Sequence, residues 1–405
     1  MKAAVIAGRV LVALLSAAVL AAAGYGWSTL QRVQESVNTT DVLTALSDVP
    51  NAPPANDGAT DILLVGSDSR TDAQGVPLPD HVLRELRTEA TDTLNTDTII
   101  VMRVPRDGSK AHAVSIPRDT YVTIPDHGQE KINSAYGVTK FLTMERLAAS
   151  GTSDLTERSK AGDQAGRRAL VQVVQELTGV RVDHYAEINL YGFYLLTEVI
   201  GGVDVCLRQA TSDPDSGANF RAGVQSISGG DALAFVRQRK GIPNGDLGRI
   251  TRQQVFMSAA MSKLLSAGTL ADPARLSGLL DAVSKSVVVD ENLDLATFAG
   301  QARGLAGGNV EFATIPVTGV GAVNERGQSV VTVDPTQVKA FVAQLLGAKT
   351  PPPTTPPTTP ASAPSTSAPT DLSPTNRFAA DHLLTLDGPR PHPRAAAQPT
   401  PPCID

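Results

Sequence analysis

Short apolar runs alternate with amphipathic segments between residues 60 and 347, and this alternation limits the possible folds most strongly. Asp61–Gly66 (DILLVG) and Asp97–Val104 (DTIIVMRV) are apolar runs of strand length, which is typical of buried strands. Apolar residues in 163–178 recur at intervals of three and four, which predicts a helix, and 247–267 predicts a second, longer one. Strands interleaved with helices predict an α/β domain whose helices cover a sheet.

The other expected elements follow from the same patterns. His112–Pro117 and Val182–Ile188 are predicted strands, and Gly230–Val236 is a predicted short helix. The polar segments 71–96 and 148–162 are predicted loops. Residues 285–347 are expected to add two strands and a final helix to the same domain, which therefore spans residues 60–347.

The amino-terminal residues resemble a membrane anchor. Lys2 and Arg9 precede Val10–Trp27, which carries no charge, and an apolar run of about 20 residues can cross a bilayer as a helix. Positive charge before the run predicts that residues 1–9 stay in the cytoplasm. The run is rich in alanine, so a cleaved signal peptide with a small-residue site at Ala21–Ala23 stays open. Both alternatives place the rest of the chain outside the cytoplasm.

The segments that flank the domain differ from it in composition. Residues 28–59 are expected to form a stalk, and residues 348–405, which begin with a Pro/Thr-rich stretch, a disordered tail. Two cysteines exclude a disulfide scaffold and a four-cysteine zinc site. Cys206 and Cys403 could pair, but Cys206 lies in the domain and Cys403 in the tail, so both are treated as free. A net charge of −6 argues against a nucleic-acid-binding protein.

Arginine and aspartate side chains gather just after the predicted strands and helices. Ligands of α/β sheets bind beyond the carboxyl ends of strands, so these charges are well placed for a site. Arginine binds phosphate oxygens in bidentate fashion, and carboxylates commonly hold Mg²⁺ that in turn holds phosphate. The combination of arginine and aspartate side chains predicts a metal–pyrophosphate site. Its candidate residues are Asp68, Arg70, Asp97, Arg118, Asp119, Arg237, Arg239, Asp246, Arg249 and Gln253.

Each of these residues also has a plainer interpretation. Arg237–Lys240 could be a solvated basic face, and Arg118 with Asp119 a surface ion pair of little energetic value. Asp246 could serve only as a helix cap. The co-occurrence of these residues on one α/β chain is what favours a site.

Eight short runs follow one another in a fixed order within residues 60–260. They are Ile62–Arg70 (ILLVGSDSR), Asp97–Thr98, Ser115–Tyr121 (SIPRDTY), Lys131–Tyr136 (KINSAY), Thr178–Tyr185 (TGVRVDHY), Gly201–Cys206 (GGVDVC), Ala232–Arg239 (ALAFVRQR) and Gly245–Gln254 (GDLGRITRQQ). In this order they resemble the LytR–CpsA–Psr family of bacterial cell-wall glycopolymer ligases. The resemblance implies a three-layer α/β/α sandwich, preceded by one transmembrane helix (residues 10–27).

The resemblance also implies an activity and its residues. Such a protein transfers a glycopolymer from a polyprenyl (undecaprenyl or decaprenyl) pyrophosphate at the membrane onto peptidoglycan, as a phosphodiester. Asp68 and Asp97 would hold Mg²⁺, or Mn²⁺ in its place. Arg118, Asp119 and Asp246 would take part in catalysis. The pyrophosphate would be bound by Arg70, Arg118, Lys131, Arg237, Arg239, Arg249 and Gln253.

Two departures from the family pattern keep other functions open. Asn95 stands where the family has an arginine, and the segment between Asp68 and Asp97 is long. A hydrolase of polyprenyl-pyrophosphate glycans and a non-catalytic lipid-linked glycan-binding or regulatory paralogue remain alternatives. An apolar groove for the lipid is expected from three stripes, which are also typical of plain core. These stripes are Val171–Leu177, Phe193–Ile200 and Phe256–Leu265.

Overall fold

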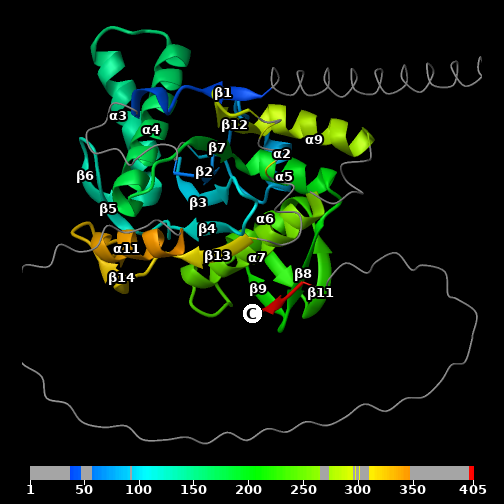
Figure 1. Ribbon diagram of the computed structural model, residues 1–405. Helices are drawn as coiled ribbons and strands as arrows, with labels where there is room; N and C mark the ends of the chain where they lie inside the picture. Colours follow the sequence, from blue (N-terminus) through cyan, green and yellow to red (C-terminus); the bar gives the residue numbers. More distant parts are fainter. Residues whose placement is uncertain are drawn as a thin grey trace, which may run out of the picture. The chain divides into compact units, whose positions relative to one another are not determined.

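A seven-stranded mixed sheet organises the domain, with the strand order β1-β12-β7-β2-β3-β4-β13 (Figure 1). The structure is a computed structural model, and it describes residues 37–46, 57–91, 94–264, 273–294, 297, 301, 310–346 and 401–405. The strands are β1 (Asn38–Thr40), β2 (Ala59–Ser67), β3 (Thr96–Pro105), β4 (Ala111–Ser115), β7 (His184–Ile188), β12 (Val287–Asp290) and β13 (Val310–Thr314). The predicted strands of residues 60–188 are therefore confirmed.

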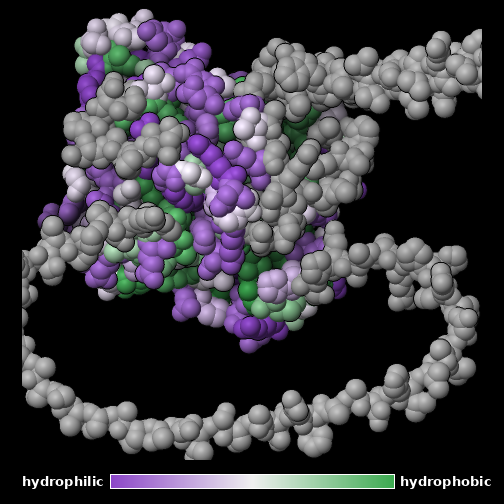
Figure 2. Space-filling view, in the orientation of Figure 1, coloured by the Kyte–Doolittle hydropathy of each residue, from purple (hydrophilic) through white to green (hydrophobic). Residues whose placement is uncertain are grey.

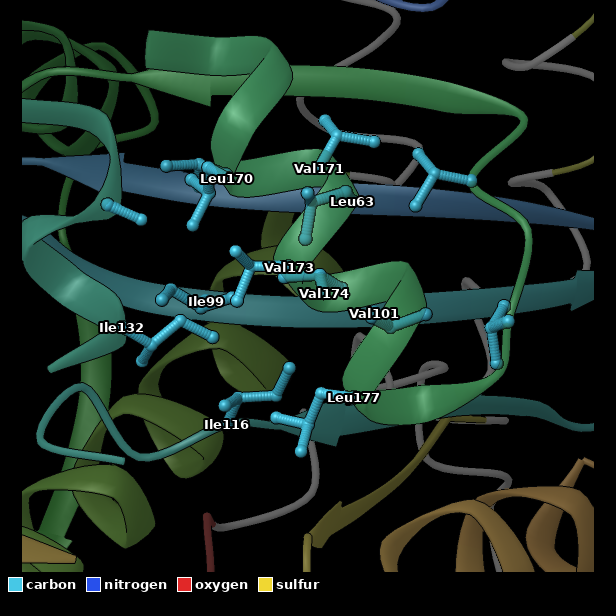
Figure 3. Packing of buried hydrophobic residues seen from close by; sticks show 14 of the residues in the cluster. Leu63, Ile99, Val101, Ile116, Ile132, Leu170, Val171, Val173, Val174 and Leu177 are labelled. Carbon is cyan, nitrogen blue, oxygen red and sulfur yellow. The ribbon is translucent and has the colours of Figure 1, made fainter. Parts of the chain in front are cut away.

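Helices cover both faces of this sheet. They are α2 (Asp80–Glu85), α3 (Ala135–Ala149), α4 (Leu155–Thr178), α5 (Leu190–Val199), α6 (Gly229–Arg237), α7 (Asp246–Leu264), α9 (Pro273–Ser286) and α11 (Pro335–Leu345). On one face, Leu170 and Val174 of α4 pack against Leu63 and Ile99 of the sheet (Figure 3). On the other face, Met257 of α7 packs against strands β3 and β4. The expected α/β/α layering is confirmed.

Hydrophilic residues make up most of the described surface visible in Figure 2, with smaller hydrophobic areas between them.

Shorter elements lie around the sheet. The peripheral strands are β5 (Tyr121–Ile124), β6 (Gly128–Lys131), β8 (Val203–Leu207), β9 (Thr211–Asp213), β10 (Ala218–Phe220), β11 (Gly223–Ile227), β14 (Gly319–Val323), β15 (Ser329–Thr332) and β16 (Cys403–Ile404), and two 3-10 turns lie at Thr44–Leu46 and Ile132–Ser134. The expectation of two strands within 285–347 was too low, since β12, β13, β14 and β15 lie there.

Both predicted loops contain helix. Helix α2 lies within residues 71–96, and α4 begins at Leu155, inside the expected loop 148–162. The early start has a local cause, because the Asp154 carboxylate accepts hydrogen bonds from the backbone N–H groups of Thr156 and Glu157. The helix ends as predicted at Gly179, whose φ of 72° is the left-handed conformation that glycine adopts readily.

The expected stalk over residues 28–59 is wrong for its described residues 37–46. Strand β1 pairs in parallel with β12 at the edge of the sheet, and Val37 and Val42 are buried in the core. Three residues are too few to show strand periodicity, so the sequence pattern missed them. The predicted anchor at residues 10–27 lies outside the described residues, and no described helix is long and apolar enough to cross a membrane.

The cysteines are paired, which corrects the expectation that both are free. Cys206 of β8 and Cys403 of β16 form a disulfide across a sequence separation of 197 residues. Strand β16 lies parallel to β8, and Ile404 packs against the apolar cluster around Phe235. The expected disordered tail is therefore wrong for residues 401–405, while residues 347–400 lie outside the described part of the chain. No sequence spacing could have revealed a contact between such distant residues.

Candidate functional site

Three strand ends meet at one edge of the sheet. Strands β2 and β3 are antiparallel, with Ser67 opposite Thr96, and β3 and β4 are antiparallel as well. The end of β2, the start of β3 and the end of β4 therefore share an edge. This pairing brings Asp68, Asp97 and Arg118 together, as the family resemblance implied.

Asp97, Arg118, Asp246 and Arg249 form an ionic network at that edge. Arg118 Nη1 donates to Asp97 Oδ1 at 2.7 Å. Asp246 Oδ1 lies 3.0 Å from Arg249 Nη2 and 3.7 Å from Arg118 Nε. Asp246 is the first residue of α7 and Arg249 follows one turn later. The carboxylate of Asp246 thus binds two arginines, which goes beyond the plain cap interpretation.

Asp68 joins this network from the β2 side. Its Oδ1 accepts a hydrogen bond of 2.7 Å from the backbone N–H of Asn95, and its Oδ2 lies 3.5 Å from Arg70 Nη1. Arg237 lies within electrostatic reach of both Asp68 and Asp97. Asn95 stands where the family has an arginine. It therefore contributes to the site through its backbone N–H group.

The remaining predicted residues fall around this centre. Lys131 Nζ lies 3.0 Å from Asp119 Oδ1, and Asp119 Oδ2 lies 3.8 Å from Arg118 Nε. Arg239 lies within electrostatic reach of Asp97. Gln253 Nε2 donates to the Val236 carbonyl at 3.2 Å, and its contact with pyrophosphate stays a prediction.

Cations outnumber carboxylates in the assembled site. Six basic side chains face four carboxylates, in a chain whose net charge is −6. Several buried polar atoms of the site have no hydrogen-bond partner in the described structure, among them Arg118 Nε, Arg249 Nε and both carboxylate oxygens of Asp246. Unsatisfied N–H groups beside excess positive charge are suited to a multiply charged anion.

The two predicted metal ligands differ electrostatically. Burial raises the pKa of Asp68, and the negative charge of Asp97 raises it further. The hydrogen bond from the Asn95 N–H lowers the same pKa, but by less than burial raises it. Burial would also raise the pKa of Asp97, but the guanidinium groups of Arg118 and Arg249 hold it below its ordinary value. Two carboxylates that repel each other suit Mg²⁺, which takes one or two protein carboxylates together with phosphate oxygens. Among the described residues, no group of three or more His, Cys, Asp or Glu forms a denser metal site.

A cavity of about 980 Å³ adjoins the charged site. Arg70 and Asn95 belong to both, and each of them contacts the carboxylate of Asp68. Helix α3 contributes apolar side chains that include Phe141 and Met144. Arg167 and Glu187 form a charged part of the wall.

The three stripes predicted to form the groove lie elsewhere. Val171–Leu177 packs into the core against the sheet (Figure 3). Phe193, Ile200 and Phe256 pack in the cluster around Phe235, whereas Met257 and Met261 pack against strands β3 and β4. Leu265 lies outside the described residues. None of the three stripes contributes to the described lining of the cavity. Apolar periodicity marks burial, and it does not distinguish a core from a cavity wall.

The fold and the site define an α/β protein with a cation-rich anion site beside a large cavity. The chain belongs to the LytR_cpsA_psr family, whose family model matches residues 25–346. It is 49% identical to the cell wall biosynthesis protein LcpA of Corynebacterium glutamicum over 85% of this chain and 66% of LcpA. It is 33% identical to the polyisoprenyl-teichoic acid–peptidoglycan teichoic acid transferase TagU of Oceanobacillus iheyensis, over 52% of this chain and 59% of TagU. The chain thus spans less than two thirds of the length of these relatives.

Two solved structures have the same fold. Bacillus subtilis TagV aligns with a TM-score of 0.50 at 20% identity, over 72% of this chain and 98% of TagV. The LytR-Csp2A-Psr enzyme from Actinomyces oris aligns with a TM-score of 0.50 at 17% identity, over 76% of this chain and 96% of that enzyme.

Proposed function

We propose that this protein transfers a glycopolymer from a polyprenyl pyrophosphate carrier onto peptidoglycan, forming a phosphodiester in cell-wall assembly. The observation that carries the proposal is that the cation-rich site adjoins the 980 Å³ cavity, with Arg70 and Asn95 common to both. A pyrophosphate with an apolar chain matches both parts, because its anionic end needs cations and its chain needs an enclosed space. The names of the relatives TagU and LcpA support the same class of reaction.

The basic residues would bind the pyrophosphate and stabilise charge in the transition state. Arg118 and Arg249 have buried Nε atoms with no hydrogen-bond partner among the described residues. Such preorganised donors stabilise charge that develops on phosphoryl oxygens. Asp68 and Asp97 are the residues that would hold Mg²⁺ or Mn²⁺, which when bound would neutralise part of the phosphate charge.

The transfer is a displacement at phosphorus. A hydroxyl oxygen of peptidoglycan forms a bond to the phosphorus on the sugar side, and the bond from that phosphorus to the bridging oxygen breaks. Polyprenyl phosphate leaves with the bonding electron pair, and the hydroxyl proton passes to a carboxylate. Asp119 and Asp246 are the candidate bases, since each has a buried carboxylate oxygen that accepts no hydrogen bond in the described structure.

We also propose that the domain works outside the cytoplasm, tethered by residues 10–27. The Cys206–Cys403 disulfide supports this location, because disulfides persist in oxidising compartments. The charge-free run after Lys2 and Arg9 supports the tether and its orientation.

The proposal can be tested by following the phosphate of a lipid-linked pyrophosphate sugar. The full-length chain in detergent is incubated with that substrate, peptidoglycan fragments and Mg²⁺. Wild type should transfer the phosphosugar to the glycan, and Arg118→Ala should lose this activity. Arg106→Ala is the matched control, because Arg106 is exposed and follows the other end of β3. Release of free phosphosugar alone would favour the hydrolase, and tight lipid binding without turnover would favour the non-catalytic paralogue.

A further inference from the structure

Arg252 is the largest side chain that the fold buries completely. Its Nη1 donates to Gln238 Oε1 at 2.9 Å, and its guanidinium carbon lies 4.8 Å from the centroid of the Phe235 ring. Its Nε and Nη2 have no hydrogen-bond partner in the described part of the chain, and Asp405 is the carboxylate that acts on it electrostatically. Burial lowers the pKa of Arg252 to about 10, so the side chain is still charged at neutral pH.

Gln238 connects this cation to the segment that follows α6. The residue is fully buried, and its backbone is extended at the end of the helix. Its Nε2 donates to Thr211 Oγ1 at 2.5 Å and to the Lys240 carbonyl at 2.9 Å. Its own carbonyl oxygen Oε1 accepts only from Arg252 among the described hydrogen bonds. The amide of Gln238 is therefore oriented from both sides.

Two anion-site arginines flank Gln238 in the sequence. The backbone of Gln238 is extended, and neighbouring side chains of an extended backbone point in opposite directions, so burial of Gln238 directs Arg239 away from the interior. Arg237 is the last residue of α6 and is only partly buried. Both arginines lie within electrostatic reach of Asp97. The segment is held further by Asp213 Oδ2, which accepts from the backbone N–H of Arg239 at 3.1 Å.

A purely structural role does not account well for Arg252. Asp405 acts on Arg252 electrostatically but accepts no described hydrogen bond from it. A buried guanidinium that is not hydrogen-bonded to a carboxylate is unfavourable for folding, and an apolar side chain of similar volume would fill the same space without that penalty. What the charge uniquely provides is a donor to Gln238 Oε1. We infer that Arg252 is a positioning residue, which acts through Gln238 to orient Arg237 and Arg239 toward the two phosphate groups of a pyrophosphate.

This inference rests on the proposed function, and its test uses inorganic pyrophosphate so that it does not depend on glycan transfer. Binding of pyrophosphate and of orthophosphate to the full-length chain is measured by calorimetry for wild type and Arg252→Met. Arg252→Met should weaken pyrophosphate binding about tenfold and orthophosphate binding much less. Its midpoint of urea unfolding should stay the same or rise. Arg252→Lys, which keeps a donor, should recover part of the loss.

Gln238→Leu supplies the second measurement. If Arg252 acts through Gln238, the double variant should bind pyrophosphate no more weakly than either single variant. Arg118→Ala serves as the positive control for loss of binding, and Arg106→Ala as the neutral one. Wild-type pyrophosphate affinity in Arg252→Met would overturn the inference, as would equal weakening for both anions together with a lower unfolding midpoint. Pyrophosphate binding without glycan transfer would overturn the proposed function alone, whereas failure of wild type to bind pyrophosphate would overturn both.

Discussion

The ion pair between Arg167 and Glu187 in the cavity wall offers a quantitative test of the structure. Arg167 Nε donates to Glu187 Oε2 at 2.8 Å, and the hydroxyl of Tyr185 donates to the same oxygen at 3.0 Å. The two charged side chains are only 14% and 8% exposed. Burial alone would lower the pKa of Arg167, but the Glu187 carboxylate raises it well above its ordinary value. The perturbation is a double-mutant cycle with Arg167→Met and Glu187→Leu.

Each single substitution should lower the free energy of unfolding much more than the double substitution does. Arg167→Met leaves the buried Glu187 carboxylate with only the Tyr185 hydroxyl, and breaking such a pair costs about 3–5 kcal/mol. The partial exposure of Arg167 to the cavity places the expected value at the lower end, about 3 kcal/mol. Replacing both residues removes both charges, so the double variant should lie within about 1 kcal/mol of wild type.

The free energy of unfolding is measured by urea denaturation of the four proteins at pH 7. With about 3 kcal/mol lost in each single variant and at most about 1 kcal/mol in the double, the expected coupling between the two sites is about 5 kcal/mol or more. Lys110 and Glu311 provide a matched control, since they form an ion pair of 2.9 Å but are 53% and 45% exposed. Their cycle should give a coupling below about 1 kcal/mol. Additive effects at Arg167 and Glu187 would refute the reasoning, because a buried pair cannot lose its partner without a penalty.

Three further predictions concern stability. Burial raises the pKa of Asp61 to about 7, so the folded state favours the neutral carboxyl and this group lowers stability, by up to about 4 kcal/mol, as the pH rises from about 4 to 7. Asp61→Asn should flatten that pH dependence in urea titrations, and parallel curves would contradict it. Gly166→Ala would bring a Cβ into the Tyr136 ring and should cost about 1–3 kcal/mol, seen as a lower melting temperature. Cys403→Ser should cost about 2–5 kcal/mol, and reduction of wild type with dithiothreitol should reproduce the loss; an effect of the variant alone would contradict the disulfide.

The strands and the charged edge could be predicted because their signals are local. Asp68 and Arg118 directly follow the apolar runs that became β2 and β4. A strand carries its flanking residues to the sheet edge wherever the rest of the chain lies. Asp97 reached the same edge at the start of a strand, since β3 runs antiparallel to β2. Strand direction is a property of the whole sheet, so the sequence pattern alone did not contain it.

The features that were mispredicted depend on tertiary contacts. The cavity lies beside α3, and helix α4 approaches that helix at Gly162 and Gly166, where an added Cβ would meet Met144 and Tyr136. A helical pattern identifies which face is apolar but not which neighbour covers it.

The bond between Cys206 and Cys403 turns residues 206–403 into a covalent ring. A protease that cuts once between residues 347 and 400 would therefore yield two peptides that remain joined through sulfur. The cut protein would gain only the mass of one water molecule under oxidising conditions and would separate into fragments only after reduction. Strand β16 would stay attached to β8 throughout, because its covalent connection does not pass through the cleaved segment. The carboxyl-terminal strand is thus secured independently of the chain that leads to it.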